Sequence, residues 1–249
     1  MIWHGLLVSV RDAVEAKAAL AGGAAIIDVK DPTAGSLGAA SAATVAAVAA
    51  TVGDRVPWTV AAGELRDEIA RPGAVHRWLT AIAAEAGRVG VPAAVKVGLA
   101  GMADSAWRRA FQQLIEELPE ATARVAVAYA DWQQVAAPHP LDIVSQLRDC
   151  CSVLLIDTAD KSGPDLLTAC PRPDLEAWVA AARGAGMAVA VAGRLQLDAI
   201  PQLGRLGADV VALRSAVCFN NRLGPVDVTL VRRAVAVVGF LETMPHGAA

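Results

Sequence analysis

Eight short apolar runs recur along this chain with helical patterns between them, and this alternation limits the possible folds more than any other feature. The runs are rich in Val, Ile, Leu and Ala and cover residues 6–10, 24–30, 57–63, 93–99, 124–131, 152–160, 188–194 and 209–215. Strand alternating with helix eight times is typical of an α/β protein with a (β/α)8 barrel. Because the runs are almost continuously apolar, we expect strands that are buried on both faces.

The segments between the runs predict helices. Residues 12–23 and 174–186 have helical patterns with Gly-rich ends, and residues 198–209 suggest a shorter helix. No linker interrupts the alternation, and α/β barrels of this length are commonly single domains. We therefore predict one catalytic barrel domain over residues 1–240, followed by a flexible tail at 241–249.

Charge and composition exclude several classes of function. The net charge of −3 and the lack of an extended basic run argue against nucleic acid as a partner. Residues 32–53 are uncharged but contain too few large apolar side chains for a membrane span. The N-terminus lacks the features of a secretion signal, which predicts a cytoplasmic protein. The four histidines and four cysteines show no ligand spacing, so we expect no metal site.

Polar side chains collect where the apolar runs end. They are Ser9, Arg11, Asp28, Lys30, Lys96, Tyr129, Asp131, Asp157, Lys161, Arg194, Arg214 and Ser215. In (β/α)8 barrels the carboxyl ends of the strands and the loops after them form the active site. The sequence therefore predicts an active site at this end of the barrel.

Lysine is rare in this chain, and its placement is informative. Of 22 basic residues only four are lysines, and Lys30, Lys96 and Lys161 stand within or directly after apolar runs. Arg stays protonated, whereas a buried Lys can lose its proton. Repulsion among three amines, together with desolvation, should lower the pKa of Lys30 from about 10.4. A single such lysine would be interpreted as an ion pair that braces the barrel, but three together favour catalysis.

An amine with a lowered pKa can attack a carbonyl group and form a Schiff base. Asp28 lies two residues before Lys30, so both side chains point to the same side of the strand. Asp28 and Asp157 can then balance charge and relay protons. The short segment 35–38 is interpreted as a lid or turn beside Lys30.

The ends of the last two runs predict a phosphate site, which such barrels often build there. The candidates are Gly193, Arg194, Arg214 and Ser215, followed by residues 219–224. Asn220 and Asn221 can adopt left-handed conformations that aim backbone N–H groups inward. Surface arginines beside an ordinary turn remain an equal alternative.

Six segments, at residues 28–39, 95–101, 129–131, 156–163, 191–193 and 213–218, together resemble the (5-formylfuran-3-yl)methyl phosphate synthase family of methanofuran biosynthesis. The resemblance implies a barrel that joins two molecules of glyceraldehyde 3-phosphate into 4-(hydroxymethyl)-2-furancarboxaldehyde phosphate, with release of phosphate and water. It implies no metal and no organic cofactor. The partners would be small triose phosphates, in the synthesis of a carrier for one-carbon metabolism.

Position by position, the resemblance implies that Lys30 forms the Schiff base and that Lys96 is the proton acceptor. It assigns the remaining acid–base chemistry to Asp28, Asp157 and Lys161. Ser9 and Asp131 are further candidates for substrate or phosphate contacts. The chain departs from the family pattern at Asp31, where Asn is usual, and at Arg194, where Ser is common.

Two other functions remain open at this stage. A simpler class I aldolase would stop at a linear adduct. A non-catalytic barrel would bind phosphorylated sugars or serve as an oligomeric scaffold. The sequence is compatible with a homo-oligomer and does not fix the oligomeric state.

Overall fold

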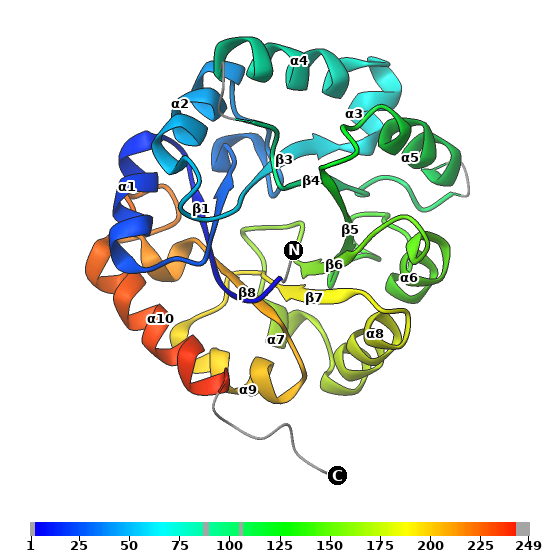
Figure 1. The fold of residues 1–249 in the computed structure, drawn as a ribbon. Coiled ribbons are helices and arrows are strands. Elements are labelled where there is room, and N and C mark those ends of the chain that lie inside the picture. The colour runs from blue at the N-terminus through cyan, green and yellow to red at the C-terminus, as the bar shows by residue number, and fades with distance from the viewer. Residues whose placement is uncertain (1–2, 87–89, 105–106, 243–249) are drawn as a thin grey trace.

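The computed structural model describes residues 3–86, 90–104 and 107–242, and it confirms the predicted fold. Eight parallel strands pair in chain order and close into a barrel, with β8 beside β1 (Figure 1). The strands are β1 (Gly5–Val10), β2 (Ile26–Val29), β3 (Trp58–Glu64), β4 (Ala94–Gly98), β5 (Ala123–Tyr129), β6 (Val153–Asp157), β7 (Ala188–Val191) and β8 (Val210–Leu213). Each of the eight apolar runs therefore coincides with one strand, and β1, β3 and β5 extend one residue beyond the predicted runs.

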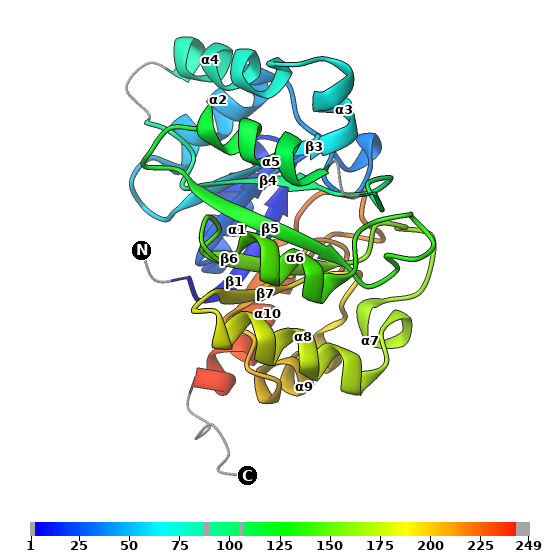
Figure 2. The same ribbon diagram turned by 90° about the vertical axis from the view of Figure 1, so that its right-hand side faces the viewer.

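The helices lie around the outside of the barrel (Figures 1 and 2). They are α1 (Ala13–Gly22), α2 (Ala42–Val52), α3 (Leu65–Ala70), α4 (Ala74–Ala86), α5 (Trp107–Glu116), α6 (Pro140–Leu147), α7 (Leu166–Ala169), α8 (Arg172–Gly184), α9 (Ile200–Arg205) and α10 (Val228–Glu242). Within the described residues, none of these helices has the length and apolarity needed to cross a membrane.

The predicted helices are present, and local signals explain their ends. The Asp12 carboxylate accepts hydrogen bonds from the N–H groups of Val14 and Glu15 at the start of α1, and Gly23 ends that helix at φ +92°. The pattern over 174–186 corresponds to α8, and the pattern over 198–209 to a 3-10 turn followed by α9. Helix α10 extends into the predicted C-terminal tail, and residues 243–249 of that tail lie outside the described residues.

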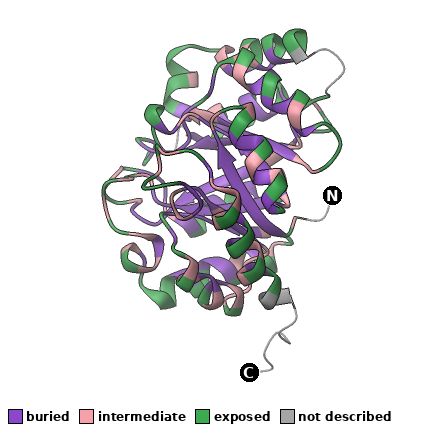
Figure 3. Ribbon diagram, turned by 90° about the vertical axis from the view of Figure 1, so that its left-hand side faces the viewer, coloured by how far each residue is buried: buried purple, intermediate pink, exposed green. Residues whose placement is uncertain are grey.

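Side chains alternate between two apolar layers along each strand. In β6, Val153 and Leu155 point into the barrel, whereas Leu154 and Ile156 pack against the helices. Figure 3 shows the consequence, with buried strands at the centre and exposed residues on the outer faces of the helices. Asp157 continues the inward series of β6, so the same alternation that builds the core aims a carboxylate into the barrel mouth.

Candidate active site

Three lysines and two aspartates meet at the carboxyl ends of the strands, as predicted. The Lys96 amine donates a hydrogen bond to Asp28 and a second one, of 3.2 Å, to the Thr59 hydroxyl. The Lys161 amine lies 2.5 Å from Asp157 Oδ1. Two ammonium–carboxylate pairs therefore stand in one site.

Asp28 is buried and fully engaged. Its Oδ2 accepts a hydrogen bond of 3.1 Å from the Ser9 hydroxyl, and its Oδ1 accepts one of 2.8 Å from the Thr59 hydroxyl. Burial opposes ionisation of Asp28, but the charges of Lys96 and Lys30 outweigh it and hold its pKa below the ordinary value. Ser9, predicted to contact substrate, lies in the site with its hydroxyl bonded to this carboxylate.

Asp157 is held in a similar way on the β6 side. Its Oδ1 accepts a hydrogen bond of 2.7 Å from the Thr158 N–H, and its Oδ2 accepts one of 3.2 Å from the Ser36 hydroxyl. Burial again opposes ionisation, and the charges of Lys161 and Lys30 lower the pKa of Asp157 overall. Both aspartates are therefore carboxylates at neutral pH.

Lys30 differs from the other two amines. It is only 9% exposed, and among the described residues its amine makes no hydrogen bond or ion pair. Burial lowers the pKa of Lys30 to about 8, although the charges of Asp28 and Asp157 act in the opposite direction. With two carboxylates facing three amines, the site is electrically balanced when one amine is neutral, and Lys30 is the amine without a paired acid.

A hollow beside Lys30 gathers the predicted phosphate-binding residues. Its lining includes Ser9, Lys30, Lys161, Gly193, Arg194, Arg214, Ser215 and Arg222. The backbone there is shaped by left-handed residues, because Gly193, Arg194 and Asn220 have φ of +102°, +57° and +65°. The expected left-handed conformation therefore occurs at Asn220, whereas Asn221 is not among the residues with positive φ.

Arg222 was not singled out from the sequence, where it is one of several arginines near turns. It is half-buried in this hollow. Burial is the main cause that lowers the pKa of Arg222, and the charges of Arg214 and Arg194 lower it further. Cations that are held together and partly desolvated favour an anion between them.

The guanidinium of Arg214 is committed within the protein. It is 7% exposed and donates hydrogen bonds of 2.9 Å and 3.3 Å to the two carboxylate oxygens of Glu15. It also donates to the backbone carbonyls of Ser9 and Arg222, at 2.8 Å and 2.6 Å, and to that of Gly224 at 3.4 Å. Arg214 thus ties the end of β8 to α1 and to the loop after β8.

The Asp131 carboxylate is likewise engaged by groups of the protein itself. Its two carboxylate oxygens accept hydrogen bonds of 2.8 Å each from the N–H groups of Ala159 and Asp160. It does not contribute to the described lining of the hollow beside Lys30. The Asp131 carboxylate instead fixes the segment that leads into Lys161.

The segment 35–38 lies across the mouth as a closed loop. The Ser36 hydroxyl bonds to Asp157 and, at 3.1 Å, to the Thr158 carbonyl, while Leu37 is buried inside the barrel. The Leu37 carbonyl accepts a hydrogen bond of 2.9 Å from the Gly63 N–H. Leu37 also lines an inner hollow of ≈ 40 Å³ within the barrel, together with Lys30 and Lys96. A triose phosphate is larger than this space, so its entry there requires the loop to move.

Glu64 is another site residue that the sequence analysis missed. It follows the third apolar run directly, so the rule that located the other polar strand ends would have found it. Its carboxylate accepts a hydrogen bond of 2.7 Å from the hydroxyl of Tyr129.

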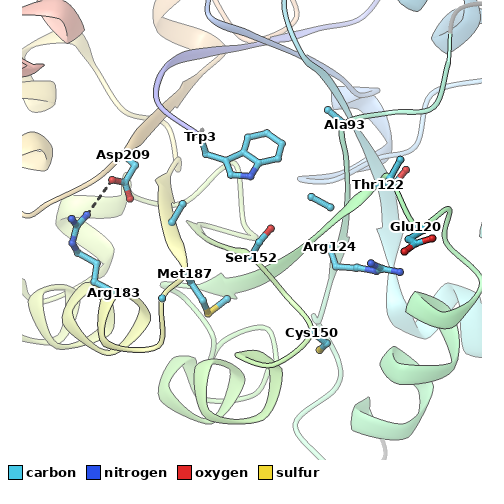
Figure 4. A pocket seen from close by; sticks show the side chains of 14 residues that line it. Trp3, Ala93, Glu120, Thr122, Arg124, Cys150, Ser152, Arg183, Met187 and Asp209 are labelled. Atoms are coloured by element: carbon cyan, nitrogen blue, oxygen red, sulfur yellow. Dashed lines mark hydrogen bonds and ion pairs between the residues drawn. The ribbon is translucent and has the colours of Figure 1, made fainter. Parts of the chain in front are cut away.

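A larger hollow, of ≈ 750 Å³, lies at the opposite end of the barrel, where the strands begin (Figure 4). Trp3, Arg124, Cys150 and Ser152 line it, together with an ion pair of 3.1 Å between Arg183 and Asp209. The four described cysteine thiols are free. This floor of the barrel brings together none of the predicted catalytic residues.

Comparison with known proteins gives a consistent family. Residues 6–235 match the family described as 4-HFC-P synthase. A (5-formylfuran-3-yl)methyl phosphate synthase of Methanococcus maripaludis strain S2 is 32% identical over 245 residues, which cover 93% of this chain and 98% of the relative. The enzyme of the same name from Methanocaldococcus jannaschii is 34% identical over 246 residues, covering 91% of this chain and 96% of the relative.

Solved structures with the same fold are more distant in sequence. A 3-hexulose-6-phosphate synthase from Salmonella typhimurium superposes with a TM-score of 0.63 at 19% identity, covering 95% of this chain and 99% of that one. A thiamine phosphate pyrophosphorylase from Pyrococcus furiosus has a TM-score of 0.58 at 13% identity, covering 96% of each chain. At such identities the likeness concerns the barrel alone.

Proposed function

Since this chain belongs to the 4-HFC-P synthase family of enzymes, we propose that it condenses two molecules of glyceraldehyde 3-phosphate into 4-(hydroxymethyl)-2-furancarboxaldehyde phosphate, a step of methanofuran biosynthesis. The observation that carries the proposal is the state of Lys30. A buried amine with a pKa of about 8, beside two ammonium–carboxylate pairs, is suited to attack a carbonyl carbon near neutral pH.

In the first step, neutral Lys30 adds to the carbonyl carbon of one triose phosphate. The carbonyl oxygen takes up protons and leaves as water, and an imine forms between substrate and Lys30. The two neighbouring pairs, Lys96 with Asp28 and Lys161 with Asp157, can supply and remove the protons of this step. The same groups serve the later enolisation and carbon–carbon bond formation.

The phosphate group is proposed to bind in the hollow beside Lys30. Arg194 and Arg222 are the cations available to its oxygens, with Ser215 and the backbone after Gly193 as further donors. Arg214 acts there through its charge and by fixing the loop after β8, because its hydrogen-bonding groups are already engaged. Asp131 acts by holding the segment before Lys161.

Incubation with glyceraldehyde 3-phosphate alone tests the function. The expected products are inorganic phosphate and a compound with the mass and absorbance of the furan aldehyde phosphate. Borohydride added during turnover should leave the substrate adduct on the peptide that contains Lys30. A linear adduct without a furan chromophore would indicate the simpler aldolase. If no covalent adduct formed on a lysine, the catalytic proposal would be wrong.

A further inference from the structure

Glu64 is a titratable group at the mouth of the barrel that takes no part in the proposed imine formation or carbon–carbon bond formation. Its Oε1 accepts the hydrogen bond from Tyr129, and its Oε2 accepts one of 2.9 Å from the Ala100 N–H. Among the described residues no lysine or arginine forms an ion pair with it. Burial raises the pKa of Glu64, although both hydrogen bonds act in the opposite direction. Two charges on the helix after β3 also act on it, Arg66 lowering and Asp67 raising this pKa. The carboxyl group is thus fixed in place without a paired cation.

A local irregularity of β3 turns Glu64 toward the site. The register with β4 shifts between Ala61 and Glu64, and Gly63 takes φ +86° in between. Such a bulge bends the strand and re-aims the side chain that follows it. Glu64 therefore leaves the alternation of β3 and reaches over the neighbouring strand.

Gly98 makes room for this arrangement. A side chain at Gly98 would collide with the Glu64 carboxylate and with the Tyr129 hydroxyl. Gly98 lies two residues after Lys96 on β4, so both positions face the same side of the strand. The Glu64–Tyr129 pair consequently lies one layer of side chains above Lys96, at the open end of the barrel.

The closed loop covers this pair. Leu37 belongs to the same inner apolar cluster as Ala61 and Tyr129, and the Tyr129 side chain is fully buried. On its other side the loop borders a second hollow of ≈ 570 Å³ that is lined by Ser36, Leu37 and Glu64. Leu37 lines both this hollow and the inner one that holds Lys30 and Lys96, so movement of residues 35–38 would join the two, and Glu64 would face the combined space.

We propose that Glu64, positioned by Tyr129 and the Ala100 amide, donates the proton for the dehydration that forms the furan ring. The inference rests on the proposed function and deepens it. The Glu64 carboxyl gives its proton to a departing hydroxyl oxygen, which leaves as water with the electron pair of the broken C–O bond. The Lys96–Asp28 pair takes a proton from the adjacent carbon through the Asp28 carboxylate, and the C–H electrons become the new C=C bond. The resulting Glu64 carboxylate regains a proton from solvent.

The test separates imine formation from ring formation. Glu64→Gln keeps the size and the acceptor for Tyr129 but has no acidic proton. In this variant borohydride should still trap the substrate on Lys30. Furan formation should fall about 10²- to 10⁴-fold, and a linear adduct should accumulate. Asp67→Asn is the control, because it removes an exposed carboxylate from the same hollow and leaves Glu64 in place. It should form furan at the parental rate where Glu64 is protonated, with the fall at high pH shifted to lower pH because the Asp67 charge helps to raise the pKa of Glu64.

Two further measurements exclude a merely structural role. The parental rate of furan formation should fall at high pH as Glu64 ionises, and Glu64→Gln should lose that pH dependence. Tyr129→Phe should slow furan formation about tenfold, because it removes one hydrogen bond that positions Glu64. If Glu64→Gln does not fold, Tyr129→Phe tests the inference in its place, and an unchanged rate of furan formation would contradict it.

A folded Glu64→Gln enzyme that forms furan at the parental rate would overturn the inference. Equal losses of trapping and furan formation would do the same, because they would indicate a structural role. If the parent enzyme itself made no furan, the proposed function would fail and this inference with it.

Discussion

The two ends of the barrel both carry charged side chains but hold them differently. At the floor, Arg183 is 48% exposed, pairs with Asp209 and donates a further hydrogen bond of 2.8 Å to the Gly207 carbonyl. At the mouth, Lys30 is 9% exposed and has neither a hydrogen bond nor an ion pair among the described residues. The floor has the larger hollow, yet the Arg183–Asp209 pair there is neutralised and open to solvent.

This contrast shows that the size of a hollow does not locate the chemistry. A desolvated amine without a paired acid is costly to keep protonated, and that cost makes it reactive near neutral pH. The loop over residues 35–38 leaves an inner hollow of only ≈ 40 Å³ next to Lys30 and Lys96. Chemical function at this mouth is therefore recognised from burial and charge rather than from open space.

The comparison is tested most severely at Lys30. Lys30→Arg keeps a positive charge but cannot become a neutral nucleophile. We expect loss of activity on the order of 10⁴-fold or more and no borohydride-trapped adduct in a folded protein. Measured in parallel, the floor variant Arg183→Ala should retain parental activity. Substantial activity in Lys30→Arg would move the imine to another lysine.

The two paired amines should matter less than Lys30, but still strongly. Lys96→Arg and Lys161→Arg retain the charge that balances each aspartate and remove a proton carrier. Folded variants should lose about 10²- to 10⁴-fold in furan formation, measured by product absorbance. Lys17→Arg, on the first helix, is the matched control and should behave like the parent. Nearly full activity of either site variant would give that lysine a structural role.

The Arg214–Glu15 ion pair is buried, whereas the Arg183–Asp209 pair is exposed. Glu15 is buried, and loss of the Arg214 guanidinium leaves its charge to the partly exposed Arg11, which donates from its side chain and its backbone N–H. The same loss removes the hydrogen bonds of Arg214 to the carbonyls of Ser9, Arg222 and Gly224. We expect Arg214→Ala to lower the free energy of unfolding by about 3–5 kcal/mol, measured by denaturant titration. Stability close to that of the parent would show that the β8 loop is held by other contacts.

The fold and the cluster of amines follow from the sequence because both depend on short-range patterns. Apolar runs of strand length recur eight times, and Asp28, Lys30 and Asp157 stand at positions that alternation turns inward. Lys30, Lys96 and Asp157 belong to three separate runs, and closure of the barrel alone brings them to one mouth. These features need no knowledge of loop conformation.

The partners of several site residues do not follow from the sequence. Whether Arg214 reaches a phosphate or Glu15 depends on how the segment between β8 and α10 folds back, which no periodicity encodes. Asp131 meets two backbone N–H groups whose direction is set by the turn after β6. Glu64 is aimed by a bulge, and a bulge shifts the register without a distinct sequence pattern.

The pH dependence of the enzyme should report Lys30. Because its pKa is about 8, kcat/KM should fall about tenfold per pH unit below pH 8, where the free enzyme holds a protonated amine. Between pH 8 and 10.5 the unfolded chain keeps a proton that the folded protein has lost, so stability should rise with pH in this window. Below pH 8 both states are protonated and the cost of burial is complete.

A Lys30→Met variant tests whether the rise in stability between pH 8 and 10.5 comes from Lys30. It should be more stable than the parent at pH 7 and should lack the rise in stability between pH 8 and 10.5, measured by denaturant titration at several pH values. A parent enzyme with flat kcat/KM between pH 6 and 9 would contradict the assignment of about 8 to Lys30.

The smallest effect is expected at the floor. The Arg183–Asp209 pair is exposed to water, which screens the attraction, so Arg183→Ala should change the free energy of unfolding by only about 0–1 kcal/mol. Asp209 keeps a hydrogen bond of 2.7 Å from the Val189 N–H, which leaves the start of β7 anchored when the arginine is lost. Stability measured at low and high salt should differ little between variant and parent. A loss as large as that of Arg214→Ala would show that the floor pair is as necessary to the barrel as the mouth pair, and the contrast between the two ends would no longer hold.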